Sequence, residues 1–174
     1  NTDGAVYVNM AASKVTDETG NLNTAAAQFG RVYDTSAPAV VLTTATTLTN
    51  GAQFEVTVTF SEDVQGADLT VDDFEVASGT AVSVASVSAQ VYTVIVDPDN
   101  DPVTIKLAAG KVRDLVGNYN SESNSITVTY DTVAPTVTLS STAPDPTNSS
   151  PIPLTITFSE RVTGFTVDDL VLDN

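Results

Sequence analysis

Apolar and polar side chains alternate along residues 54–60, FEVTVTF, so that every second position is Phe or Val. Side chains of a β-strand point alternately to opposite faces, so this period of two predicts a strand with one buried face. No helical pattern of useful length is present, and AGKVRD at 109–114 is the one candidate for a helical turn. Further stretches with strand character are residues 40–42, 74–76, 82–87, 92–96, 103–107, 126–130 and 152–158.

Whole segments of this chain occur twice. YDTSAP begins at Tyr33, and YDTVAP begins at Tyr130, 97 residues later. Three further pairs of segments match in the same order with nearly the same shift: 12–34 with 109–131, 54–64 with 152–162, and 70–76 with 166–172. Self-similarity of this kind predicts a tandem array with a period near 97 residues. The predicted parts are the back of one module at 1–33, one complete module at 34–130, and the front of a third module at 131–174.

The complete module therefore holds about seven short strands, separated by turn sequences such as TNG at 49–51 and VGN at 116–118. Many short alternating strands with turns between them predict an all-β fold with an immunoglobulin-like β-sandwich in each module. The repeated phrase joins one module to the next. Because Pro38 and Pro135 restrict the residues before them to extended conformations, we expect a short, stiff linker and an extended rod.

Composition supports strands and excludes several functions. Val and Thr, which are both β-branched, make up about 30% of the chain. The 22 acidic and 6 basic side chains give a net charge of −16, which argues against binding to nucleic acid or to an anionic membrane. The chain has no Cys and no His, so zinc chemistry and the usual catalytic triads are excluded. No apolar run approaches the ~20 residues of a membrane helix, so we expect no membrane insertion.

The acidic residues concentrate in loops and linkers. If the strands alternate in direction, the N-terminal linker and the loops after residues 60 and 107 lie at one end of the module, which we call the linker end. The loop at 97–102 and the next linker then lie at the opposite end. The candidate ligands at the linker end are Asp34, Glu62, Asp114 and Asn118. Those at the opposite end are Asp97, Asp99, Asp101 and Asp131, joined by Glu160 of the following module.

Calcium takes six to eight oxygen ligands from carboxylates and carbonyls at loosely constrained angles, so both ends could supply a calcium site at a junction. A bound ion would screen the repulsion between carboxylates and fix the angle between modules. Turn chemistry alone offers another interpretation, because Asp and Asn side chains commonly bond to local backbone. On that interpretation Asp114 only caps a turn, and the sequence leaves both readings open.

The order D-T-x-A-P, T-F-S-E-x-V, V-D-D and G-K-V-x-D-x-x-G-N resembles the bacterial Ig-like repeat domains of large surface adhesins and secreted fibrous proteins. The resemblance covers the whole chain, once as an entire module and twice in part. It implies an extracellular location, tandem copies, frequent calcium at module junctions and no catalysis. Glu62-Asp63 in one copy is matched by Glu160-Arg161 in the next, so an acidic site need not be the same at each junction.

The leading hypothesis is a non-catalytic stalk or fibre on a bacterial surface. One alternative is a module that binds carbohydrate or a host protein, although Tyr7 and Tyr119 are the few aromatics expected to be exposed. Another is a spacer attached to a secreted enzyme, since the chain opens on NTDGAVYV as though cut from a longer one. The expected partners are neighbouring repeats of the same chain, or identical chains whose partial modules complete one another and form a filament.

Overall fold

The structure is a computed structural model that describes residues 3–173. It divides into two compact units, residues 1–131 and residues 132–174. The described residues contain strands and three short 3₁₀ turns, and none of their helical segments is long and apolar enough to cross a membrane. The prediction of an all-β protein is therefore confirmed.

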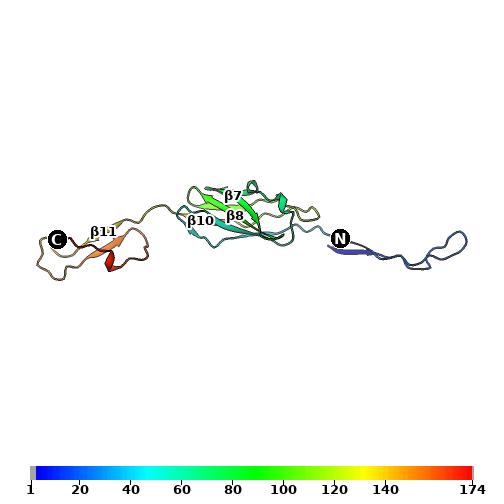
Figure 1. The fold of residues 1–174 in the computed structure, drawn as a ribbon, viewed down its shortest axis with the longest axis horizontal. Helices are drawn as coiled ribbons and strands as arrows, with labels where there is room; N and C mark the ends of the chain where they lie inside the picture. Colours follow the sequence, from blue (N-terminus) through cyan, green and yellow to red (C-terminus); the bar gives the residue numbers. More distant parts are fainter. Residues whose placement is uncertain (1–2, 174) are drawn as a thin grey trace. The chain divides into compact units, whose positions relative to one another are not determined.

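Two four-stranded sheets form the sandwich of the complete module (Figure 1). One sheet has the order β3-β5-β8-β7 and the other has the order β4-β10-β9-β6. All pairs are antiparallel except β4 with β10, which is parallel. The strands are β3 (Val40–Thr43), β4 (Leu48–Thr49), β5 (Phe54–Phe60), β6 (Phe74–Ala77), β7 (Gly79–Ser86), β8 (Val91–Pro98), β9 (Val103–Leu107) and β10 (Ile126–Tyr130).

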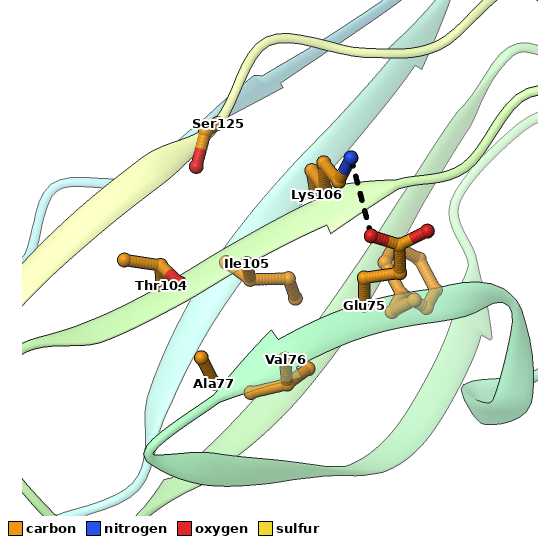
Figure 2. A pocket seen from close by; sticks show the side chains of 8 residues that line it. Glu75, Val76, Ala77, Thr104, Ile105, Lys106 and Ser125 are labelled. Carbon is orange, nitrogen blue, oxygen red and sulfur yellow. Dashed lines mark ion pairs between the residues drawn. The ribbon is translucent and has the colours of Figure 1, made fainter.

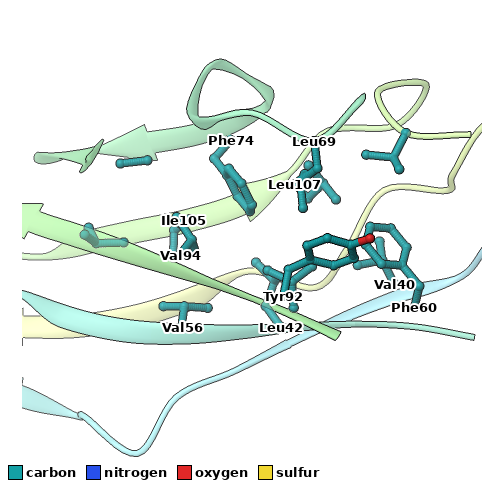
Figure 3. Close-up of a cluster of buried hydrophobic side chains, with 14 of the residues drawn as sticks. Val40, Leu42, Val56, Phe60, Leu69, Phe74, Tyr92, Val94, Ile105 and Leu107 are labelled. Atoms are coloured by element: carbon teal, nitrogen blue, oxygen red, sulfur yellow. The ribbon is translucent and has the colours of Figure 1, made fainter. Parts of the chain in front are cut away.

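The alternating pattern of the sequence becomes the core of this sandwich. Along β5 the Phe and Val positions are buried, and the Glu and Thr positions between them are exposed or half-buried. Figure 3 shows how side chains of both sheets interdigitate, with the ring of Tyr92 next to that of Phe60. These two rings meet edge to face at 6.0 Å between centroids. The fully buried positions include Leu42, Val56, Val58, Val94, Val96, Val103, Ile105, Leu107, Val112 and Val128.

The loop at 109–114, the one candidate for a helical turn, is not helical. The 3₁₀ turns lie instead at Gly66–Asp68, Val71–Asp73 and Val167–Asp169. The turn at Val71–Asp73 begins at Thr70, whose N–H and hydroxyl both donate to the Asp73 carboxylate. Residue Thr166 does the same with Asp169, so this local motif is repeated in both copies.

The partial copies form the same hairpins as the complete module. Strand β1 (Gly4–Val8) pairs with β2 (Phe29–Tyr33), with Val8 opposite Phe29, as Ile105 lies opposite Ile126 in the complete module. In residues 132–174, β11 (Val137–Ser140) pairs with β12 (Thr155–Phe158). Their register repeats that of β3 with β5 pair by pair.

Candidate metal centre at the linker end

Three carboxylates converge at the linker end of the complete module. Asp34 comes from the linker, Glu62 follows β5, and Asp114 lies in the loop between β9 and β10. One carboxylate oxygen from each lies within 4.8 Å of the others. Among residues 3–173, this is the one group of three acidic side chains placed closely enough to share an ion. Together with Asp63, Leu115 and Val116, the three carboxylates line a hollow of about 140 Å³.

Asp114 is held by its own loop and is 1% exposed. Its Oδ1 accepts hydrogen bonds from the backbone N–H groups of Val116, Gly117 and Asn118, at 2.8, 2.6 and 2.9 Å. Its Oδ2 accepts one from Nδ2 of Asn118 at 2.8 Å. Burial acts to raise the pKa of Asp114, but these hydrogen bonds outweigh it and hold the pKa below its usual 3.8. Asp114 therefore caps its own turn, and one of its carboxylate oxygens also lies within 4.8 Å of oxygens of Asp34 and Glu62.

Unlike Asp114, Glu62 has a half-buried carboxylate that makes no hydrogen bond or ion pair with the residues that the structure describes. Burial raises the pKa of Glu62, and the charges of Asp34, Asp114 and Asp3 raise it further. Loss of hydration is the larger cause of the raised pKa, and repulsion between like charges adds to it. A cation placed among these groups would relieve this repulsion.

The linker is held on both sides of the site. Asn118, which closes the Asp114 loop, also donates from Nδ2 to the carbonyl oxygen of Asp34 at 3.3 Å. Asp3 accepts from the N–H and the hydroxyl of Thr35 at 3.0 and 2.7 Å, and from the hydroxyl of Ser36 at 2.5 Å. The Ser36 and Thr35 hydrogen bonds lower the pKa of Asp3. The linker therefore carries side-chain contacts to the strands before it and to the module after it.

Sequence reasoning missed Asp3 as a residue of this junction. A signal was available, because Asp3 precedes β1 much as Asp101 precedes β9, and β1 and β9 are equivalent strands of the repeat. Asp101 itself accepts a hydrogen bond from the backbone N–H of Tyr130, next to the following linker, at 2.8 Å. Asp101 thus bonds to Tyr130, the last residue of β10, which pairs with β9. Asp3 bonds in the same way to Thr35, just beyond β2, which pairs with β1.

The predicted ligands at the opposite end form other contacts. Asp97 accepts from Nε2 of Gln53 at 3.3 Å, and the backbone N–H of Asp99 donates to the carbonyl of Ser78 at 2.9 Å. Among the residues that the structure describes, Asp97, Asp99, Asp101 and Asp131 are not drawn together into a group of three. Glu160 lies in residues 132–174, the unit described by itself. Their role as metal ligands stays a prediction.

The donor groups at the linker end suit a hard cation such as calcium. All three side chains offer hard carboxylate oxygens, and no basic side chain lines the hollow. Calcium accepts mixed carboxylate and carbonyl ligands at irregular angles, which suits groups contributed by a linker and two loops. Soft or imidazole-binding metals have no ligands here, because the chain has neither Cys nor His.

A larger hollow of about 510 Å³ lies on the outer side of β6 and β9 and contains Lys106 (Figure 2). The Lys106 ammonium lies 2.9 Å from Glu122 and 3.1 Å from Glu75. These hydrogen bonds, first that of Glu122, raise the pKa of Lys106, so it stays charged and unreactive as a nucleophile. Lys106 lies on the outer face of β9, and this hollow carries its ion pairs with Glu122 and Glu75.

Comparison with known proteins gives one match. A family model described as "Bacterial Ig-like domain" matches residues 34–130 and again residues 131–174. No curated protein and no solved structure matches the chain. The two matched segments meet at the repeated linker phrase, and together they cover more than half of the chain. The resemblance drawn from the sequence motifs is confirmed by this match.

Proposed function

The chain belongs to the family of bacterial Ig-like domains, and on that premise we propose that it is a non-catalytic structural or adhesive repeat of an extracellular bacterial protein. Domains of this family are generally non-catalytic modules and commonly occur in extracellular or surface proteins. The observation that carries the proposal is the repeated module with a short linker that is bonded on both sides. A linker of this kind suits a rod or fibre made of successive modules.

We propose further that calcium stiffens the junction at the linker end. Asp34, Glu62 and Asp114 would hold the ion, and Asn118 would position both Asp34 and Asp114 for it. The ion would supply positive charge and bridge the linker to two loops of the module. The chain's own contribution is to place three carboxylates close together, where burial first and the neighbouring charges second raise the pKa of Glu62.

The partners that we propose are neighbouring repeats of the same chain. The partial modules of two identical chains could instead complete one another, but the strands that they supply make this less favourable. Strands β1 and β2 correspond to β9 and β10, and β11 and β12 correspond to β3 and β5, so the pair would still lack a counterpart of the central strand β8.

A calcium titration followed by thermal unfolding tests the proposal. We expect millimolar calcium to raise the melting temperature by several degrees and a chelator to reverse the rise. Glu62→Gln should abolish most of this response. The matched control is Glu160→Gln, because Glu160 occupies the same repeat position in residues 132–174 and belongs to no close group of three acidic side chains among the residues that the structure describes. An equal calcium response in the wild type and in the Glu62 variant would contradict the calcium site while leaving the structural role intact.

The structural role has its own test. Small-angle scattering of the protein with and without calcium measures how extended it is in solution. We expect a longer maximum dimension and a narrower distribution of distances with calcium, since a fixed linker reduces bending. A compact particle under both conditions would contradict the rod.

A further inference from the structure

The edge of strand β3 is closed by side chains rather than by another strand. The outer side of β3 would expose the N–H and C=O of Leu42, because its other neighbour is β5. Asn124 fills this place: its Oδ1 accepts from the Leu42 N–H at 2.8 Å, and its Nδ2 donates to the Leu42 carbonyl at 3.0 Å. One amide side chain thus makes both hydrogen bonds that a residue of a neighbouring strand would make.

The closure extends over the whole segment that leads into β10. The backbone N–H of Ser121 donates to the carbonyl of Pro38 at 3.0 Å, just before β3 begins. Ser123 turns to the other sheet, where its hydroxyl accepts from the N–H of Leu107 at 2.9 Å. Ser121 and Asn124 bond to the β3 side, and Glu122 and Ser123 bond to β9 of the other sheet, so the segment covers the side of the sandwich where β3 would otherwise be open. Unpaired strand edges are ready sites for pairing with other chains.

In the first copy of this segment, the side chains that bond to the two sheets are replaced by alanine. With the 97-residue shift, Ser123 corresponds to Ala26 and Asn124 corresponds to Ala27. The copies agree elsewhere in this region: Asn23 and Asn120 make the same bonds to backbone, each accepting from two successive N–H groups and donating to two carbonyls. The segment after this asparagine differs at every position, since residues 24–28 read TAAAQ and residues 121–125 read SESNS, and the amide side chain that closes the β3 edge is replaced by Ala27.

We propose that the side chain of Asn124, supported by Ser123, prevents the β3 edge from pairing with a strand of a second copy of this chain. A module with Ala at both positions, as the sequence of residues 26–27 specifies, presents an open edge there. The modules of one array then differ in whether they associate sideways, and the amino acids at these two positions decide it. This lateral contact is separate from the linker site and does not depend on calcium.

Replacing Asn124→Ala in the whole chain tests the proposal. Asn124 is exposed, so the variant is expected to fold. Sedimentation equilibrium should show self-association tightened by about tenfold or more relative to the wild type. Two controls separate edge opening from other effects. Glu122→Ala changes a neighbour that leaves the edge closed, and Asn120→Ala destabilises the adjacent loop without exposing Leu42.

Amide hydrogen exchange at Leu42 gives a second readout. In dilute Asn124→Ala protein the Leu42 amide should exchange faster than in the wild type, and it should regain protection at concentrations where the variant associates. The proposed role of Asn124 is supported if self-association rises in Asn124→Ala and not in the two controls. It is overturned if Asn124→Ala sediments as the wild type does, or if Asn120→Ala associates equally, which would make instability the cause.

Discussion

The hairpin β3–β5 and its copy β11–β12 have the same register and nearly the same pattern of apolar residues, yet their environments differ completely. Leu42 is 1% exposed, whereas Leu139, its equivalent, is 60% exposed. The difference lies in the partner strands. β8 and the sheet containing β9 cover β3 and β5, and residues 132–174 contain no counterpart of those strands. Local sequence determines the hairpin, and burial depends on strands that are distant in the chain.

The largest expected effect concerns these two leucines. Leu42→Ala removes a fully buried side chain and should lower the free energy of unfolding of the complete module by about 3 kcal/mol. Leu139→Ala should change it by less than about 0.5 kcal/mol, as expected of an exposed residue. Urea denaturation followed by circular dichroism measures both. Comparable losses for the two variants would show that residues 132–174 are packed into a common core.

The buried asparagine of the loop gives the next comparison. Asn120 is 3% exposed and satisfies four backbone groups, so Asn120→Ala should cost about 1–3 kcal/mol by leaving those groups unpaired. Asn23→Ala removes the same set of bonds in the exposed copy of the loop. Water can replace them there, so the same denaturation experiment should show little change in the stability of the complete module. An equal cost would mean that the first copy of the loop also supports the core.

Much of this outcome could be predicted from the sequence. The period of two located the strands of the sandwich from 40–43 to 126–130, and the stretch at 152–158 contains β12, whereas β1, β2 and β11 were not named as strands from the sequence. The two-residue strand β4 escaped prediction, since Leu48 and Thr49 are too few to show a period. At the site, alternation of strand direction brought Asp34, Glu62 and Asp114 to one end. Only side-chain geometry could reveal that Asp114 is bonded by its own loop, and that Asp3 reaches the linker.

Low pH should affect the stability of the complete module through only one of the two copies of the Asp–Asn loop, the copy that contains Asp114. The pKa of Asp114 is lowered in the folded protein, so its contribution to stability is present above its unfolded value and is lost as the pH falls through the folded value. The melting temperature of the complete module should therefore drop by several degrees between about pH 5 and pH 2, and this drop should be smaller in Asp114→Asn.

Asp17, the equivalent of Asp114, is the control. Hydrogen bonds from Asn21 and Thr19 lower the pKa of Asp17 in the same way, but the group is fully exposed. Asp17→Asn should therefore leave the acid sensitivity of the complete module unchanged. Equal flattening of the two pH profiles would show that Asp114 has no special role in the fold.

The smallest expected effect is that of Glu62, whose influence on stability depends on pH in the opposite direction to that of Asp114. The pKa of Glu62 is raised in the folded state, so the protonated form is favoured, and this stability is lost as the pH rises through the folded value. Without calcium, Glu62→Gln should therefore raise the melting temperature at pH 7 by a few degrees, and the difference should vanish at pH 4. Glu160→Gln should show no such rise. A lower melting temperature for Glu62→Gln at pH 7 would contradict the repulsion between these carboxylates.

The central claim is that residues 34–130 form one closed sandwich, whose buried core needs no side chain from the hairpins before and after it. Hydrogen exchange measured by mass spectrometry, segment by segment on the monomeric protein, tests it most directly. Strands β5 and β8 should exchange only through global unfolding, and β1 and β12 should exchange orders of magnitude faster. Protection of β11 and β12 equal to that of β3 and β5 would contradict the account.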